Sequence, residues 1–198
     1  LNWRFRNKER KKTPFFVTQD STAQRPAQKV GEYYAKAIND TFGTDFDVLF
    51  GPAYKGIPLT VATSMAISEH FGADIKYCSN RKEVKDHGDK GILLGSPIAD
   101  GEKVVIIEDV TTAGTSIEET LPIISAGDVD VLGLVVSVDR CERGKGEKSA
   151  LTEIQEKYGF RTTAIVTMKE VVEHLYNKEY KGKVIIDEHI KSSDRRIL

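Results

Sequence analysis

The chain has 198 residues, enough for a single domain that buries roughly 70% of the surface its unfolded chain exposes. Lysine and arginine total 29 against 30 aspartates and glutamates, so the net charge of −1 gives no global sign of nucleic-acid binding. With only two cysteines, no signal-peptide pattern and no apolar run near about 18 residues, the sequence favours a cytoplasmic protein without a membrane partner.

The N-terminal segment is nevertheless strongly basic, because lysine and arginine crowd residues 4–12. Such a run predicts a solvated arm, with anion binding as the alternative. An aromatic, strand-like segment follows at residues 13–17. The absence of an initiator methionine suggests that a short N-terminal piece is missing.

Apolar runs typical of strands alternate with helical patterns along the rest of the chain. Helices are expected at residues 27–42, 58–71, 116–125, 149–158 and 168–177. Strands are expected at residues 46–50, 75–78, 92–94, 104–107, 131–138 and 163–166, with a short strand or apolar run at 184–186 and a frayed helix or tail at 187–198. This alternation predicts an α/β fold: a Rossmann-like parallel sheet flanked by helices, within one domain of residues 1–198.

Three local details accompany this assignment. The first helix carries a broad apolar face that includes both Tyr33 and Tyr34. Residues 92–94 could pair with 104–107 in a hairpin around residues 99–101. Pro122 removes one backbone hydrogen bond from its helix, which predicts a kink or an early end.

Residues 104–116 carry the clearest chemical signal. Four β-branched aliphatic residues at 104–107 predict a strand buried on both faces, and Glu108 and Asp109 follow at its carboxyl end, where ligands bind in open α/β sheets. A small, hydroxyl-rich loop then leads to Ser116, which with Glu119 fits a capping box at a helix start. Backbone N–H groups at a helix N-terminus bind anions. The order predicts a site for a phosphorylated sugar, with carboxylates for ribose hydroxyls and the loop for a phosphate.

Two further segments place cations near this site. Residues 51–58 form a tight turn after a strand, and Lys55 there predicts neutralisation of pyrophosphate, a plain connection being the alternative. Residues 80–91 are very polar and carry Arg81, Lys82, Lys85 and His87. Such a run is either a surface loop or a lid that closes over a polyanion.

Four segments, at residues 50–59, 80–88, 104–116 and 139–144, together resemble the orotate phosphoribosyltransferases among the type I phosphoribosyltransferases. The resemblance is nearly unbroken from residue 46 to 160. It implies the type I phosphoribosyltransferase fold with a small N-terminal hood over the base site, formed by residues 1–26 and part of the C-terminal region. It also implies transfer of the phosphoribosyl group of phosphoribosyl pyrophosphate (PRPP) to orotate, which gives orotidine 5′-phosphate and pyrophosphate in pyrimidine biosynthesis.

The resemblance also implies Mg²⁺ held mainly by PRPP and pyrophosphate, and a homodimer with shared active sites. Expected PRPP contacts are Lys8, Tyr54, Lys55, Arg81, Lys85, His87, Glu108, Asp109, Val110, Thr111, Thr112, Ala113, Gly114, Thr115 and Ser116, with Lys82 supplied by the neighbouring subunit. Expected orotate contacts are Phe16, Val17, Thr112 and Arg140. The expected catalytic set is Arg81, Lys82, Lys85, His87 and Asp109, with Lys85 and His87 both open as the acid. A cis peptide is expected at Ala53–Tyr54.

Two departures from the family pattern and two alternative functions remain. Glu108 stands where the family often has aspartate, although both can accept ribose hydroxyls, and a family glycine is missing near Lys8. A purine or uracil phosphoribosyltransferase is disfavoured by Arg140, whose simpler role is an ion pair with Asp139, because a neutral base needs no buried cation. A noncatalytic PRPP-binding regulator that touches nucleic acid through its basic arm is disfavoured by the intact lid sequence at 80–88.

Overall fold

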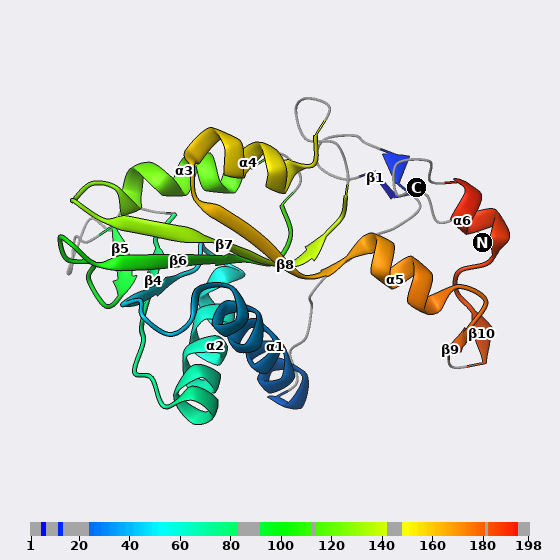
Figure 1. The fold of residues 1–198 in the computed structure, drawn as a ribbon, viewed down its shortest axis with the longest axis horizontal. Coiled ribbons are helices and arrows are strands. Elements are labelled where there is room, and N and C mark those ends of the chain that lie inside the picture. The colour runs from blue at the N-terminus through cyan, green and yellow to red at the C-terminus, as the bar shows by residue number, and fades with distance from the viewer. Residues whose placement is uncertain are drawn as a thin grey trace.

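The computed structural model describes residues 5–6, 12–13, 24–82, 92–111, 114–141, 148–180 and 182–193. At its centre lies a six-stranded sheet in the order β5-β4-β3-β6-β7-β8 (Figure 1). The strands are β3 (Val48–Phe50), β4 (Lys76–Asn80), β5 (Leu93–Gly95), β6 (Lys103–Glu108), β7 (Asp130–Asp139) and β8 (Arg161–Thr167). All neighbours run parallel except β4 and β5, which are antiparallel. The predicted α/β fold with its largely parallel sheet is confirmed, with one antiparallel edge.

The predicted hairpin between residues 92–94 and 104–107 is wrong. β5 pairs with β4 instead, with Leu94 opposite Ser79. β6 has parallel neighbours on both edges, β3 and β7, so it has no edge left for a hairpin partner. The strand with four consecutive buried aliphatic residues therefore takes the centre of the sheet, and the short, more exposed β5 takes the edge.

Helices cover both faces of the sheet (Figure 1). α1 (Gln24–Phe42) and α2 (Gly56–Phe71) lie on one face, and α3 (Thr115–Ile124) and α4 (Ala150–Tyr158) lie on the other. The residues of β6 alternate between the two cores: Val105 and Ile107 pack in the α1–α2 core, and Val104 and Ile106 pack in the α3–α4 core. All four are 0% exposed, which confirms the strand buried on both faces.

The helix ends show where local sequence signals hold and where they fail. α2 ends at Phe71, as predicted, with Gly72 as its C-cap, and Ser149 caps α4 by accepting a hydrogen bond from the Thr152 N–H. The predicted capping box at Ser116 and Glu119 is wrong, because α3 begins one residue earlier, after Gly114, and the Ser116 hydroxyl bonds elsewhere. Pro122 lies inside α3, which continues for only two residues beyond it.

The remaining elements lie outside the main sheet. They are β1 (Phe5–Arg6), β2 (Lys12–Thr13), α5 (Met168–Leu175), β9 (Glu179–Tyr180), β10 (Lys183–Val184) and α6 (Glu188–Ser193). β1 and β2 form an antiparallel ladder, so the basic segment contains ordered backbone pairing that a solvated arm does not predict. Residues 14–17 of the predicted aromatic strand lie outside the described residues. Each helix in the described ranges is too short or too polar to cross a lipid bilayer.

Candidate active site

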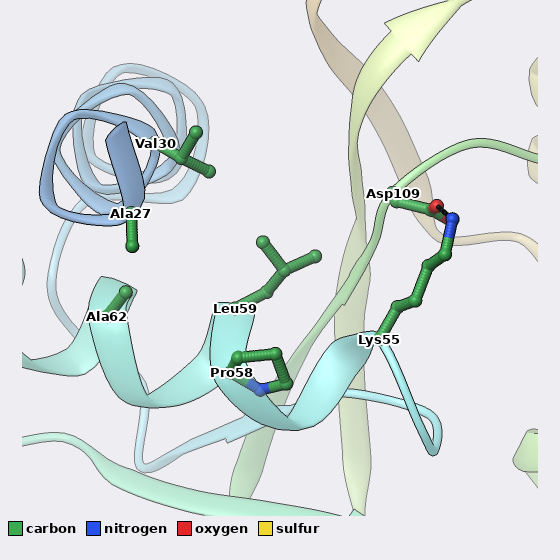
Figure 2. A pocket seen from close by; sticks show the side chains of 7 residues that line it. All are labelled: Ala27, Val30, Lys55, Pro58, Leu59, Ala62 and Asp109. Atoms are coloured by element: carbon green, nitrogen blue, oxygen red, sulfur yellow. Dashed lines mark hydrogen bonds and ion pairs between the residues drawn. The ribbon is translucent and has the colours of Figure 1, made fainter. Parts of the chain in front are cut away.

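The two acidic residues at the end of β6 point to opposite faces of the sheet because side chains alternate along a strand. Glu108 follows Ile106 toward the α3 face, and its Oε2 accepts a hydrogen bond of 2.5 Å from the Ser116 hydroxyl. Asp109 faces the opposite layer, where its Oδ2 accepts a 2.8 Å hydrogen bond from Lys55 Nζ (Figure 2). The acid pair thus joins the start of α2 to the start of α3. It brings together two of the segments that the sequence assigns to one site, residues 50–59 and residues 104–116.

Lys55 is held in place by the tight turn that precedes α2. A Cβ atom added at Gly51 would lie 2.4 Å from the carbonyl oxygen of Gly56, so the two ends of the turn touch through backbone alone. The turn is tied to the end of β4, because the Ala53 N–H donates to Asn80 Oδ1 at 2.9 Å. The peptide bond between Ala53 and Tyr54 is cis, as predicted. The turn therefore directs the Lys55 side chain toward Asp109.

The electrostatic state of Glu108 differs from that of a surface carboxylate. Its side chain is only 7% exposed, and burial raises its pKa from 4.5 to about 7. The hydrogen bond from Ser116 acts in the opposite direction, and the neighbouring charge of Asp109 raises the pKa further. Near neutral pH, Glu108 is therefore poised between its neutral and ionised forms.

The loop after the acid pair folds back on itself at both described ends. The Val110 N–H donates to Asp109 Oδ1 at 2.8 Å, and the Gly114 N–H donates to Thr111 Oγ1 at 3.2 Å. Gly114 has a φ of 71°, which favours glycine, and α3 begins directly after it at Thr115. A loop that opens into a helix N-terminus in this way is suited to bind an anion.

Other predicted residues lie at neighbouring strand ends. Tyr54 is 62% exposed, and Lys82 Nζ lies 5.6 Å from the centre of its ring. The Arg81 N–H donates to the Ile92 carbonyl at 2.8 Å, which ties the two ends of the polar segment together. Arg140 is buried directly after β7. These strand ends gather at one edge of the sheet, as carboxyl ends of parallel strands do.

Several predicted site residues cannot be placed in this arrangement. The residues that lie outside the described ranges are Lys8, Phe16, Val17, Lys85, His87, Thr112 and Ala113. Their predicted roles therefore stay predictions.

Two residues near the acid pair were not identified from the sequence. The hydroxyl of Tyr34 on α1 donates to the Glu108 carbonyl at 2.6 Å, and the hydroxyl of Ser137 on β7 donates to the Asp109 carbonyl at 2.5 Å. The sequence places Tyr33 and Tyr34 together on an apolar face, yet Tyr33 is 58% exposed and Tyr34 is 0% exposed. A tyrosine on the buried face of a helix indicates that its hydroxyl needs a hydrogen-bond partner. The sequence does not identify that partner, because it lies 74 residues away.

A small cavity of about 80 Å³ lies between α1 and α2, next to the Lys55–Asp109 ion pair (Figure 2). Its lining residues are Ala27, Val30, Lys55, Pro58, Leu59, Ala62 and Asp109. Most of this lining is apolar, so the ion pair stands at the edge of an apolar surface. The cavity is too small to hold a nucleotide-sized ligand.

Comparisons with known proteins agree with this geometry. Residues 19–162 match the model of the phosphoribosyl transferase domain family. The chain is 73% identical to the orotate phosphoribosyltransferase of Lachnoclostridium phytofermentans, covering 96% of this chain and 85% of that protein. It is 62% identical to the orotate phosphoribosyltransferase of Clostridium beijerinckii, over 94% and 84% of the two chains. The crystal structure of the Francisella tularensis orotate phosphoribosyltransferase aligns with a TM-score of 0.77 at 28% identity, covering 98% of this chain and 88% of that chain.

Proposed function

The chain belongs to the orotate phosphoribosyltransferases of the phosphoribosyltransferase family, and from this premise we propose how its residues bind the two substrates. The enzyme transfers the 5-phosphoribosyl group of PRPP to orotate, which yields orotidine 5′-phosphate and pyrophosphate. The observation that carries our assignment of the site is the convergence of Lys55 and Ser116 on the acid pair, at 2.8 and 2.5 Å. Lys55, the acid pair and the loop that ends at Ser116 serve the pyrophosphate, the ribose and the 5-phosphate of one PRPP molecule.

PRPP binds across the acid pair. Glu108 and Asp109 accept hydrogen bonds from the ribose hydroxyls, and the loop of residues 110–116 holds the 5-phosphate at the N-terminus of α3. The charge of the pyrophosphate is neutralised by Lys55, Arg81, Lys85 and His87, and Tyr54 contacts PRPP beside them. Lys55 donates to Asp109 at 2.8 Å, so the cation for the pyrophosphate and the acceptor for a ribose hydroxyl lie side by side.

Orotate binds beside Arg140, with Phe16, Val17 and Thr112 completing its pocket. Orotate is an anion, and arginine offers a planar pair of donors that matches a carboxylate or a carbonyl edge. Its position supports this role, because Arg140 directly follows β7 at the edge of the sheet where the other predicted site residues gather. This selects orotate over neutral bases.

The reaction needs no nucleophile from the protein. The ring nitrogen of orotate displaces pyrophosphate at the anomeric carbon through a transition state with oxocarbenium character. The residues therefore act by positioning the two substrates and by stabilising the charge on the leaving pyrophosphate. Lys85 or His87 protonates the pyrophosphate as it leaves.

The site also suits Mg²⁺ in the manner in which this ion binds phosphorylated substrates. The described residues contain no cluster of three or more His, Cys, Asp or Glu side chains, so a cage made by protein alone is not found there. Mg²⁺ prefers one or two carboxylates plus substrate oxygens, which is the donor set that Glu108, Asp109 and PRPP provide. The ion supplies positive charge against the pyrophosphate.

We further propose a homodimer in which Lys82 reaches the site of the neighbouring subunit. Mixing a Lys82→Ala subunit with an Asp109→Asn subunit should restore part of the activity, because one hybrid site then carries both native residues. Each variant alone provides the control. Mixed dimers that form but remain inactive would contradict the shared site.

The proposal also covers a hood over the base site and the cellular location of the enzyme. Residues 1–26 and part of the C-terminal region form a hood over the base site; β1, α5 and α6 lie at the same end of the molecule (Figure 1). The enzyme works in the cytoplasm, consistent with unpaired thiols at Cys78 and Cys141.

The base assignment is tested by substitution of Arg140. Loss of orotate absorbance in the presence of PRPP and Mg²⁺ reports turnover, with adenine, hypoxanthine and uracil run in parallel. Arg140→Lys should raise the KM for orotate by at least about tenfold and leave the KM for PRPP nearly unchanged, because lysine loses the planar donor pair. The surface variant Arg161→Lys is the matched control. Equal effects on both substrates would refute the role of Arg140.

A further inference from the structure

The carbonyl group of Glu108 lies where the sheet no longer supplies a hydrogen-bond donor. The Asp109 carbonyl points to β7, since it accepts the Ser137 N–H at 3.0 Å. Carbonyl groups alternate in direction along a strand, so that of Glu108 points to the other side, toward β3. β3 ends at Phe50, which pairs with Ile106, and does not extend as far as Glu108.

Tyr34 supplies the missing donor. Its hydroxyl reaches the Glu108 carbonyl at 2.6 Å from α1, and its side chain is 0% exposed. Burial raises the pKa of this hydroxyl above its ordinary value, which keeps it protonated and able to donate. The next carbonyl, that of Asp109, receives a second donor besides the strand bond, because the Ser137 hydroxyl lies 2.5 Å away.

Two hydroxyl groups from different elements thus fix two successive peptide units. The side chains of these peptide units are the acid pair, and their directions depend on the backbone that carries them. A shift of a fraction of an ångström in that backbone would move both carboxylates relative to the ribose hydroxyls.

We propose that Tyr34 and Ser137 are positioning residues that hold Glu108 and Asp109 in the geometry required to bind the ribose of PRPP. This inference rests on the proposed role of the acid pair and extends it to two residues that need not touch substrate. The proposal thus links α1, which lies outside the βαβ segments of the site, to the affinity for PRPP.

The test compares ligands that do and do not carry ribose hydroxyls. Tyr34→Phe and Ser137→Ala each remove a single hydroxyl and should raise the KM and the dissociation constant for PRPP by about three- to tenfold. The inhibition constant of pyrophosphate, measured without Mg²⁺, should change little, because pyrophosphate has no hydroxyl for the acid pair and no metal ion then links the two. General loosening of the site would weaken both ligands alike.

Three matched controls accompany these variants. Tyr33→Phe removes the neighbouring, exposed hydroxyl and should leave PRPP affinity unchanged. Ile38→Val removes a buried methyl group from the α1–α2 core and keeps every hydroxyl group, so it shows what destabilisation alone does. Ser137→Thr keeps the hydroxyl and should retain the affinity that Ser137→Ala loses.

Asp109→Asn separates the two levels of the proposal. If Asp109→Asn leaves PRPP affinity unchanged, the assignment of the acid pair fails and the positioning role fails with it. If Asp109→Asn weakens PRPP while Tyr34→Phe and Ser137→Ala do not, only the positioning role is refuted. Should Tyr34→Phe not fold, the Ser137→Ala and Ser137→Thr pair decides the question. Equal weakening of PRPP and pyrophosphate would also overturn the inference.

Discussion

Glu108→Gln is expected to stabilise the unliganded protein at alkaline pH. The pKa of Glu108 rises from 4.5 to about 7, mainly because burial disfavours the charged form. Between these two values the folded state holds a proton that the unfolded chain has already released, so the free energy of unfolding falls as pH rises. Above pH 7 the ionised group costs the folded state about 3 kcal/mol.

Glutamine removes this charge while it keeps the shape of the side chain. Its amide oxygen can still accept the Ser116 hydroxyl, which is the shorter of the two bonds at Glu108. The longer bond, from the Asp109 N–H at 3.3 Å, loses its acceptor, so the gain will be somewhat smaller than the full charge effect. The variant and the native protein should therefore differ little at pH 5 and differ by about 2–3 kcal/mol at pH 8.

Urea denaturation followed by circular dichroism at several pH values from 5 to 8 measures this difference. Glu119→Gln, an exposed position on α3, is the control and should follow the native curve. Because other groups titrate in both proteins, the difference between native and variant curves isolates Glu108. If the two curves run parallel from pH 5 to 8, the burial of an ionisable group at this position is refuted. Glu108→Gln should also bind PRPP more weakly, since the charge of Glu108 strengthens ligand binding while it destabilises the fold.

Three further changes test other parts of the site. Lys55→Met should raise the KM for PRPP at least about tenfold but change stability by less than about 1 kcal/mol, because its ion pair is half exposed; kinetics and thermal melting measure both. Gly51→Ala should abolish activity, since its Cβ would meet the Gly56 carbonyl at 2.4 Å, whereas Gly159→Ala, whose Cβ meets nothing within 4 Å, should keep kcat despite a cost of about 1–2 kcal/mol. Burial raises the pKa of the Cys78 thiol to about 11, so Cys78 should react with iodoacetamide only after unfolding, as mass spectrometry of the labelled protein can show. Each prediction has one result that would contradict it: an unchanged KM in Lys55→Met, an inactive Gly159→Ala, or labelling of Cys78 in the native protein.

Some parts of the site could be predicted from sequence because their signals are local. Glu108 and Asp109 follow directly on four aliphatic residues, and Lys55 lies within a turn marked by two glycines. Strand, turn and helix patterns place such residues at the carboxyl edge of a parallel sheet without knowledge of tertiary contacts.

Other parts depend on contacts between distant segments. Ser116 had a good local partner in Glu119, yet the hydroxyl bonds to Glu108 because the start of α3 packs against the end of β6. Tyr34 bonds to Glu108, which lies 74 residues further along the chain, and the hydrophobic periodicity of a helix does not predict such a partner. The predicted pairing of residues 92–94 with 104–107 is wrong for a similar reason, since the partner of an antiparallel edge strand depends on its neighbour in space rather than on its own few residues.

The antiparallel edge also has a consequence for how this enzyme can vary. β4 leads out to Arg81 and Lys82 and β5 leads back from Ile92, with the Arg81 N–H bonded to the Ile92 carbonyl. The connection between β4 and β5 therefore begins and ends at residues that are hydrogen-bonded to each other. The entropic cost of closing a connection with fixed ends rises by only about 0.6 kcal/mol for each doubling of its length. Insertions and deletions there should therefore alter how far its cations reach while the parallel strands keep their register, so reach and fold can evolve separately.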